Sequence, residues 1–317
     1  MTHMSEWFFD RYGTPEVLSL RRRAVPIPGP GEVLVKVLAT AINPSDVKNV
    51  SGHFKSRTPR VPGRDFAGVV AAGCGREGEE VWGSGSGFGV ARDGAHAQYI
   101  VLRSSWVGRK PAKLDMAQAA AVGVPYLTAY CSLVTEGRLQ EGETALVTGV
   151  SGAVGRAATQ IAHWRKARVI GAGRSPENPS GADLLVDTTK QDLPGRVMEL
   201  TGGKGADLAL DAVGGPMFEA CLRSLGRRGR QIAIVSDPQV VSFNLVDFYH
   251  GMKHLVGVDS MGLGGEEILA SMDALRAGFE AGALEAPAVK TWAFEEAVEA
   301  YRAVARGGVP VKHVLVP

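Results

Sequence analysis

Residues 144–155, TALVTGVSGAVG, constrain the fold of this chain more than any other stretch. A short apolar run typical of a buried strand enters a turn containing Gly149, Gly152 and Gly155, and small apolar residues follow at helical spacing. In such a unit the first glycine makes the tight turn, the second admits a pyrophosphate and the third lets the helix pack on the strand. The phosphates bind free N–H groups at the helix N-terminus. The pattern predicts a dinucleotide site; the alternative is an ordinary glycine-rich turn.

The end of the next predicted strand, 168–172, indicates which dinucleotide binds. Proteins that use NAD place an acidic residue there to bind the ribose hydroxyls, whereas this chain has Gly173, Arg174 and Ser175. A guanidinium is a rigid fork of donors that suits a 2′-phosphate. Glu177 lies close in the sequence and would weaken that preference. The sequence favours NADPH; the alternative is that Arg174 is a solvated surface residue.

The composition is compatible with a soluble enzyme. With 317 residues, 45% of them hydrophobic, the chain is long enough for two domains. The net charge of +2, from 35 basic and 33 acidic residues, argues against nucleic acid or an anionic membrane as the main partner. No apolar run is expected to reach the roughly 18 residues of a membrane span, and the N-terminus has no signal-peptide pattern. Three widely spaced cysteines suit a reducing cytoplasm.

Two regions differ in their predicted secondary structure. Before residue 122, strands near 32–38, 65–72 and 97–102 alternate with Pro/Gly turns, which predicts a small, partly open β-barrel with a mobile loop at 83–89. Farther on, strands and helices alternate, which predicts a parallel sheet. The expected strands are 144–148, 168–172, 184–186, 207–211, 229–235 and 255–258, with helices beginning near 152, 192 and 215.

The domain boundaries follow from this change. We expect one domain over 1–122, completed by 285–317, and a dinucleotide-binding domain over 123–284. The last segment ends in a strand-like run, and we expect it to return to the β-rich domain.

Several motifs occur in the order and spacing of a known family. They are NPSD at 43–46, PGRDFAG at 62–68, GEEVWG at 78–83, AAAVGVPYLTAY at 119–130, the glycine motif, GGKGAD at 202–207 and GRRGR at 226–230. The chain resembles a medium-chain dehydrogenase/reductase of the zinc-free, quinone-oxidoreductase (zeta-crystallin-like) and enone-oxidoreductase branch. The resemblance implies a GroES-like, partly open β-barrel catalytic domain, a Rossmann domain with a doubly wound parallel sheet, and hydride transfer.

The resemblance also implies that no metal is bound. Zinc members of the superfamily hold a metal on Cys, on the His of a Gly-His-Glu triplet, and on a later Cys or His. The corresponding residues here are Asn43, Arg64 and Val124, none of which is a zinc ligand in this setting. Without a Lewis acid, an alcohol lacks its usual alkoxide stabiliser, so reduction of a conjugated acceptor is favoured.

Candidate catalytic residues are carried over from the family. Asn43 and its neighbours line the nicotinamide pocket there, and Lys48 stands where zeta-crystallin relatives have Tyr, as in plant-type enone oxidoreductases. A Lys at this place is expected to bind the substrate carbonyl and stabilise the developing enolate; the alternative is an exposed Lys. Tyr126 and Tyr130 are candidate pocket residues, although simple packing explains them equally well. Thr128 is expected to contact the cofactor.

The remaining expected cofactor contacts lie at the ends of predicted strands and near the C-terminus. Where some relatives have Tyr beside the adenosine phosphate, this chain has Thr188, and the family's Ser-Val-Gly is Ala-Val213-Gly. Lys312 is expected to reach the cofactor phosphates, or else to be solvated. The expected cofactor-binding residues are Asn43, Thr128, Ser151, Gly152, Ala153, Val154, Gly173, Arg174, Ser175, Val213, Val235, Ser236 and Lys312.

These observations predict an NADPH-dependent reductase that acts, without metal, on a quinone or on the C=C bond of a small α,β-unsaturated carbonyl. The alternatives are acyl-thioester or halogenated acrylate substrates, and a cofactor-binding protein with little catalysis. The resemblance further implies a cytoplasmic homodimer in which the strand near 255–259 pairs with its copy across a two-fold axis.

Overall fold

The computed structural model describes residues 3–174, 180–235, 239–308 and 311–317. The chain forms two compact units: Met1–Leu127 with Ser260–Pro317, and Thr128–Asp259. The boundaries expected from the sequence, 122/123 and 284/285, differ mainly at the second position. Helix α7 (Gly265–Ala281) accounts for that difference, because it packs against β5 (Glu80–Ser84), β7 (Gly108–Arg109) and the turn η2 (Ser104–Trp106) of the first unit.

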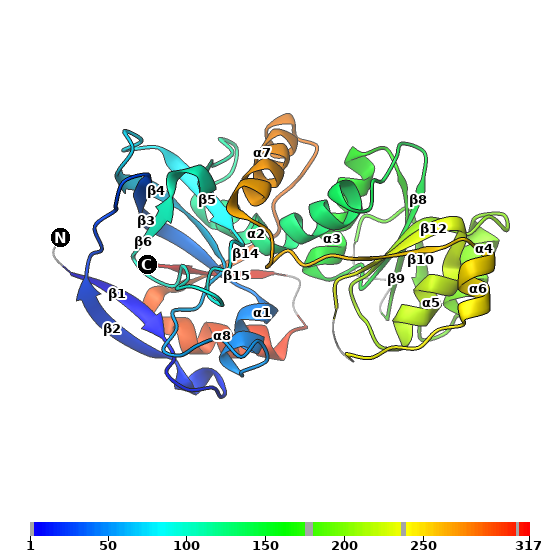
Figure 1. Ribbon diagram of the computed structural model, residues 1–317, viewed down its shortest axis with the longest axis horizontal. Helices are drawn as coiled ribbons and strands as arrows, with labels where there is room; N and C mark the ends of the chain where they lie inside the picture. Colours follow the sequence, from blue (N-terminus) through cyan, green and yellow to red (C-terminus); the bar gives the residue numbers. More distant parts are fainter. Residues whose placement is uncertain (1–2, 175–179, 236–238, 309–310) are drawn as a thin grey trace. The chain divides into compact units, whose positions relative to one another are not determined.

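The first unit is built on a seven-stranded sheet (Figure 1). Its strand order is β14–β15–β3–β4–β5–β7, and β6 also pairs with β3. The long strand β3 therefore carries β4 along one edge and both β6 and β15 along the other. Alternate residues Val33, Val35 and Val37 of β3 are buried in the core of this sheet. The strands not yet delimited are β3 (Glu32–Ile42), β4 (Asp65–Ala72), β6 (Tyr99–Arg103), β14 (Val289–Ala293) and β15 (Lys312–Val316).

The C-terminal segment returns to this β-rich unit, as expected. Strand β15 pairs antiparallel with β3 and parallel with β14. A second core of this unit joins helix α8 (Ala297–Arg306) to α1 (Pro44–Val50) and to β1 (His3–Phe8), which pairs with β2 (Ser19–Ala24). Two short turns, η1 (Pro15–Val17) and η4 (Phe294–Glu296), contact α8 as well.

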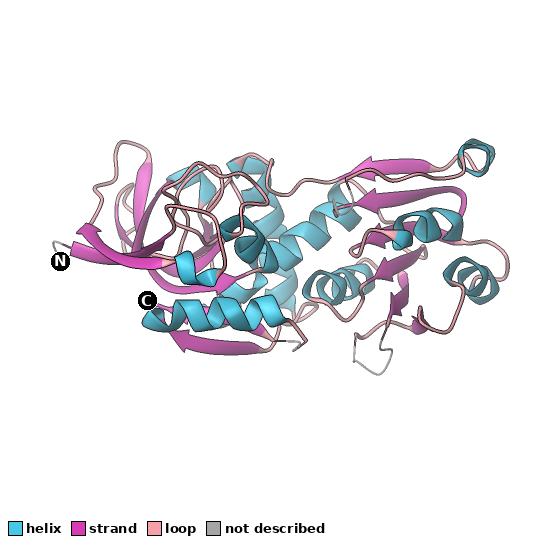
Figure 2. Cartoon of the chain, turned by 90° about the horizontal axis from the view of Figure 1, so that it is seen from below, coloured by secondary structure: helices cyan, strands magenta, loops and turns pink. Residues whose placement is uncertain are grey.

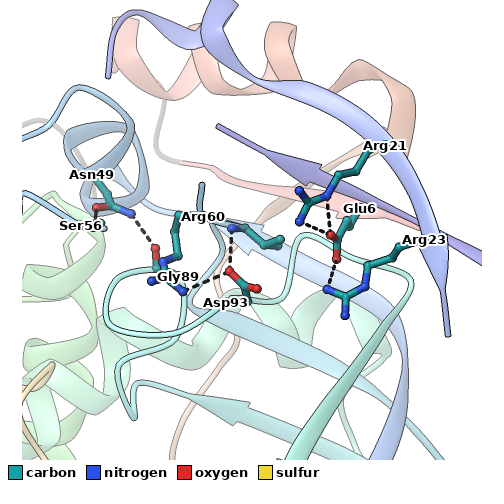
Figure 3. A network of polar contacts seen from close by, with 9 residues as sticks. Glu6, Arg21, Arg23, Asn49, Ser56, Arg60, Gly89 and Asp93 are labelled. Atoms are coloured by element: carbon teal, nitrogen blue, oxygen red, sulfur yellow. Dashed lines mark hydrogen bonds and ion pairs between the residues drawn. The ribbon is translucent and has the colours of Figure 1, made fainter. Parts of the chain in front are cut away.

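In the stretch 83–89, expected to be a mobile loop, the first two residues are strand and the other five form turns. Its first two residues belong to β5, and the segment that follows is tied to its surroundings by side chains (Figure 3). Asn49 donates from Nδ2 to the carbonyl of Gly89 at 2.6 Å, and Arg60 donates to Asp93 at 3.1 Å. These partners are distant in the sequence, so the glycine-rich composition of the segment gives no sign of the contacts.

The second unit contains a six-stranded parallel sheet in the order β10–β9–β8–β11–β12–β13. Strands β9 and β10 are added on one side of β8, and strands β11, β12 and β13 are added on its other side. Right-handed crossovers therefore place α3 on one face of the sheet and α4, α5 and α6 on the other (Figure 1). This is the doubly wound Rossmann order. The strands are β8 (Thr144–Thr148), β9 (Arg168–Gly173), β10 (Leu184–Asp187), β11 (Ala206–Asp211), β12 (Leu225–Ala233) and β13 (His254–Gly257), and the helices are α3 (Ala153–Trp164), α4 (Leu193–Leu200), α5 (Pro216–Ser224) and α6 (Leu245–His250).

Both fold predictions are confirmed, and most predicted elements of the second unit begin within one residue of their observed starts. The alternation of helices and strands in this unit is visible in Figure 2. The largest difference is β12, which begins four residues before the expected 229 because Leu225 pairs with Ala206 ahead of a register shift.

One sequence expectation about a membrane is wrong. Helix α2 (Met116–Tyr130) continues into the π-helical turn η3 (Cys131–Thr135), and together they form a 20-residue helix that is apolar enough to cross a membrane. The stretch contains no charged residue, but many of its residues are Ala, Gly, Thr or Ser, so it does not read as one strongly apolar run. Two thirds of it (67%) is buried inside the protein, as in a core helix.

Candidate functional site

The glycine turn between β8 and α3 has the geometry that its sequence predicts. Gly149 has a φ of +59°, which L side chains rarely adopt. A Cβ on Gly155 would lie 2.4 Å from the carbonyl oxygen of Gly149, so only glycine lets α3 begin this close to the strand. Gly152 is exposed, and its N–H donates to the Gly149 carbonyl at 2.8 Å.

The start of α3 fits a pyrophosphate group. Gly152 is the N-cap and offers no side-chain cap, and the first turn of the helix has no acidic residue. N–H groups of a first turn lack partners within the helix and carry the positive end of its dipole. Ala153 is exposed beside them, while Ser151 and Val154 are partly buried. Because the exposed N-cap Gly152 has no side chain, an anion can approach the N–H groups of the first turn of α3.

Other predicted cofactor residues follow neighbouring strands of the same sheet. Gly173 ends β9 and pairs with Asp187 of β10, and the exposed Arg174 comes directly after it. Ser175 and Ser236 lie outside the described residues. Val235, partly buried, follows β12. Because the strands are parallel, all of these positions lie at the carboxyl edge of the sheet, where α/β proteins bind ligands.

Sequence reasoning missed the residue that orders the loop after β11. Asp211 accepts from the hydroxyl of Thr148 at 2.9 Å and from the N–H groups of Val213 and Gly214 at 3.0 Å. The same loop approaches the glycine turn, because a Cβ on Gly149 would lie 3.1 Å from the Val213 side chain. Val213 is 48% exposed. Its expected place beside a cofactor is therefore set by a buried carboxylate.

The candidate catalytic residue Asn43 belongs to a buried polar cluster in the first unit. We define the Asp65 cluster as Asn43, Asp46, Arg64, Asp65, Ser84 and Lys312, each at most 6% exposed. Asn43 ends the loop after β3, Asp65 begins β4, Ser84 ends β5 and Lys312 begins β15. The fold thus brings the ends of four strands and the start of α1 to one point.

Hydrogen bonds connect the Asp65 cluster. Lys312 Nζ donates to Asn43 Oδ1 at 2.5 Å, and Asn43 Nδ2 donates to Asp65 Oδ2 at 2.8 Å and to Asp46 Oδ2 at 3.2 Å. The other oxygen of Asp65 accepts from Ser84 Oγ at 2.6 Å and from the N–H of Val124 at 3.0 Å. These bonds use both N–H groups of the Asn43 amide.

The sequence around α2 allows this close approach. A Cβ on Gly123 would lie 2.2 Å from Asp65 Oδ1, so glycine is required where the helix passes over the carboxylate. The N–H of the next residue, Val124, is then the donor to that oxygen. Val124, at a position that corresponds to a zinc ligand in relatives, thus contacts Asp65 through its backbone N–H.

Burial dominates the electrostatics of the cluster. It raises the pKa of Asp46 and Asp65 and lowers the pKa of Lys312, while the attraction between the opposite charges works against each of these changes. Arg64 donates to the hydroxyl of Ser45 at 3.1 Å, and its charge also favours the ionised form of Asp46. Two carboxylates and two cations give a cluster without net charge when all four are ionised.

The structure places Lys312 differently from both sequence expectations. It was expected to reach cofactor phosphates or to be solvated, but its side chain is buried and bonded within the cluster. Lys48, on α1, is exposed, and its ammonium has no ion-pair partner among the described residues. The two catalytic candidates, Asn43 and Lys48, therefore occupy very different environments on one short segment.

One of the two aromatic pocket candidates is a core residue. Tyr126 is 2% exposed, donates to the carbonyl of Glu285 at 2.5 Å and packs against Phe279. Tyr130 is partly buried, and burial raises the pKa of its hydroxyl. Thr128, expected to contact the cofactor, is 8% exposed. Simple packing accounts for Tyr126.

Within the described parts of the chain, no group of three or more His, Cys, Asp or Glu side chains is arranged to hold a metal. At the two carboxylates of the cluster, the neighbouring polar groups are instead an ammonium, a guanidinium, an amide and a hydroxyl. Such cations oppose the binding of a further positive charge.

Comparison with known proteins identifies the family. Residues 29–112 match the model of the alcohol dehydrogenase GroES-like domain, and residues 153–275 match that of the zinc-binding dehydrogenases. A zinc-type alcohol dehydrogenase-like protein of Schizosaccharomyces pombe is 35% identical over 301 residues, which cover 91% of this chain and 90% of that protein. Human quinone oxidoreductase is 31% identical over 309 residues, with 93% and 92% covered.

Solved structures agree over the whole chain. An alcohol dehydrogenase superfamily protein from Novosphingobium aromaticivorans has a TM-score of 0.88 at 29% identity and covers 99% of both chains. A Pseudomonas syringae quinone oxidoreductase has a TM-score of 0.87 at 25% identity, with 99% of this chain and 100% of that chain covered. Together with the two-unit fold and the glycine turn, these relatives show that the chain belongs to the medium-chain dehydrogenase/reductase superfamily, in its quinone oxidoreductase branch.

Proposed function

We propose that this oxidoreductase uses NADPH, without a metal, to reduce a quinone or the C=C bond of a small α,β-unsaturated carbonyl. The observation that carries the proposal is the open glycine turn before α3, combined with Arg174 at the end of β9, where NAD-dependent proteins place an acid. Relatives named quinone oxidoreductases support the class of acceptor.

The residues of the glycine turn hold the diphosphate, and Arg174 binds the 2′-phosphate that distinguishes NADPH from NADH. When bound, the dinucleotide supplies a hydride to the acceptor. In an enone, addition at the β-carbon moves negative charge to the carbonyl oxygen. Lys48, whose ammonium is exposed and free of ion pairs among the described residues, donates a hydrogen bond to that oxygen and stabilises the enolate.

The proposal that no metal takes part is supported by the chemistry of the Asp65 cluster. Asn43, Arg64 and Val124 stand at the positions of the zinc ligands of relatives, and none of them offers a thiolate, imidazole or carboxylate. Lys312 and Arg64 already compensate the two carboxylates. Purified, tag-free protein should therefore contain far less than one zinc per chain and keep its activity after dialysis against a chelator.

Cofactor preference is tested by binding rather than by turnover. NADPH should bind at least tenfold more tightly than NADH, and Arg174→Glu should reverse that preference by repelling the 2′-phosphate. Arg168→Glu is the matched control, because Arg168 is exposed at the opposite end of the same strand and should leave the ratio unchanged. Equal dissociation constants of the unmodified protein for the two dinucleotides would refute the preference.

The reaction is tested by NADPH oxidation over quinones, alkenals, enones, acyl thioesters and halogenated acrylates. Lys48→Ala should lower turnover by roughly a hundredfold with little change in NADPH affinity, and Lys48→Arg should restore only part of it. Lys36→Ala removes another exposed lysine of the same unit and should have no effect. Turnover of Lys48→Ala at the wild-type rate would make Lys48 a solvated surface residue, and absence of turnover with every acceptor would favour a cofactor-binding protein.

A further inference from the structure

Arg156 has an unusual position in the first turns of α3. It is the residue after Gly155 and the fourth of the helix. Long side chains on a helix point back toward its N-terminus, and the Nε of Arg156 accordingly donates to the carbonyl of Ser151, in the glycine turn, at 2.9 Å. Its guanidinium is therefore held against the turn that the diphosphate is proposed to occupy.

The guanidinium is poorly satisfied by the protein itself. Arginine has five N–H donors, and the bond to Ser151 uses one of them. The Nη2 atom is buried and has no hydrogen-bond partner among the described residues. A buried donor without an acceptor is destabilising, more so when it carries charge.

The positive charge of Arg156 is also unfavourable at the N-terminus of α3. The N-terminus of a helix carries a partial positive charge, so a cation beside it is repelled. Neither a capping side chain nor an acidic residue in the first turn of α3 offsets this repulsion. A group that is both unsatisfied and electrostatically unfavourable in the free protein is typical of a functional position. An anion bound at the turn would remove both penalties.

We propose that Arg156 is a diphosphate-binding residue. It acts on the diphosphate that NADPH and NADH share, whereas Arg174 acts only on the 2′-phosphate of NADPH. The inference rests on the proposed function only in that the turn takes a dinucleotide; it does not depend on the acceptor or on turnover.

A purely structural role makes the opposite prediction for stability. If Arg156 serves only to tie the Ser151 carbonyl, Arg156→Met should lower the melting temperature of the free protein and leave affinity nearly unchanged. If it binds the diphosphate, Arg156→Met should keep or raise the melting temperature of the free protein, because an unfavourable charge is removed, and should weaken ligand binding.

The experiment measures the melting temperature of the free protein and the dissociation constants of NADPH, NADH and inorganic pyrophosphate. For Arg156→Met we expect all three constants to rise by tenfold to a hundredfold, roughly the effect of losing a hydrogen bond to a charged group. Arg156→Lys should retain part of the affinity, since it keeps the charge but not the fork. Arg174→Glu should weaken NADPH alone.

Arg165→Met is the matched control, because Arg165 caps the opposite end of the same helix, where a cation is favourable. It should lower the melting temperature slightly and leave the three dissociation constants unchanged. Unchanged constants in Arg156→Met, or a lowered melting temperature of its free form, would overturn the inference. Failure of the unmodified protein to reduce any acceptor, with the Arg156→Met effect on binding intact, would overturn the proposed reaction and support this inference.

Discussion

Replacing Lys312 by methionine should destabilise the first unit strongly, because it removes the cation from two buried carboxylates. Lys312 is 6% exposed, and its charge favours the ionised forms of both Asp65 and Asp46. Removing one partner of a buried ion pair costs about 3–5 kcal/mol. That is a large part of the roughly 5–15 kcal/mol that holds a typical protein folded.

A double-mutant cycle tests the pairing of Lys312 with Asp65. The double variant, Asp65→Asn with Lys312→Met, should recover much of the stability that Lys312→Met loses. In the single variant Asp65→Asn, the new amide N–H groups would face Asn43 Nδ2, which now donates to Asp65 Oδ2 at 2.8 Å. Without Lys312, Asn43 Oδ1 loses its donor, so the Asn43 amide can rotate and accept from residue 65 at the cost of its 3.2 Å bond to Asp46. The two changes should therefore be less destabilising together than the sum of the single ones.

Urea unfolding at pH 7 measures this cycle, followed by tryptophan fluorescence, because Trp7, Trp82, Trp106 and Trp292 lie in the unit that contains the cluster. Lys110→Met is the control: its side chain is 5% exposed, but its carboxylate partner Glu80 is 58% exposed and stays hydrated, and its ammonium otherwise bonds only neutral carbonyls. It should cost about 1–2 kcal/mol, in the range of ordinary hydrogen bonds. Additive effects, or a loss below about 1 kcal/mol for Lys312→Met, would refute the reasoning.

Three further predictions follow from the same contacts. Burial lowers the pKa of His96 to about 4, so the unfolded chain binds a proton at this residue as the pH falls below about 6.5, before the folded chain does. The free energy of unfolding should therefore drop by roughly 3 kcal/mol between pH 6.5 and pH 4, and His96→Gln should lack this part of the pH dependence. Ser84→Ala removes the hydroxyl donor to Asp65 and should cost about 1–3 kcal/mol by urea unfolding, whereas Ser104→Ala on the partly buried turn η2 should cost less. The edge strand β13 and helix α6 expose Leu255, Val246 and Tyr249 at 43%, 55% and 57%, and we propose that a second copy of the chain covers them. Light scattering should give a dimer mass for the unmodified protein and a monomer mass for Leu255→Arg; a monomer mass for the unmodified protein would contradict the proposal.

The dinucleotide-binding unit was predictable because its signals are local. Each strand of the parallel sheet is a short apolar run beside a turn, and the glycine turn occupies seven consecutive residues. The conformation of Gly149 and the close approach at Gly155 are consequences of that short segment alone. Local patterns therefore located the end of β8 and the start of α3 to within one residue.

The Asp65 cluster was not predictable in the same way, because its members come together only through the tertiary fold. Asn43 and Lys312 are separated by 269 positions, and no periodic pattern links the start of the last strand to the end of the loop after β3. The sequence alone predicts a glycine-rich loop at Ser84, although β5 carries this residue to the Asp65 carboxylate. Side chains whose partners are set by sheet pairing carry no local signal of their role.

The hydrogen bonds of Asn43 change how its proposed catalytic role must be understood. Both amide N–H groups are given to Asp65 and Asp46, and Oδ1 already accepts from Lys312, so the side chain has no free donor with which to bind a ligand. Its backbone N–H also donates to Asp46 Oδ2 at 2.8 Å, which fixes the first turn of α1. Lys48 lies on the last turn of that seven-residue helix. In the proposed reaction, Asn43 therefore acts by fixing the start of the helix that carries Lys48, and substitutions at Asn43 should change turnover through the position of that ammonium.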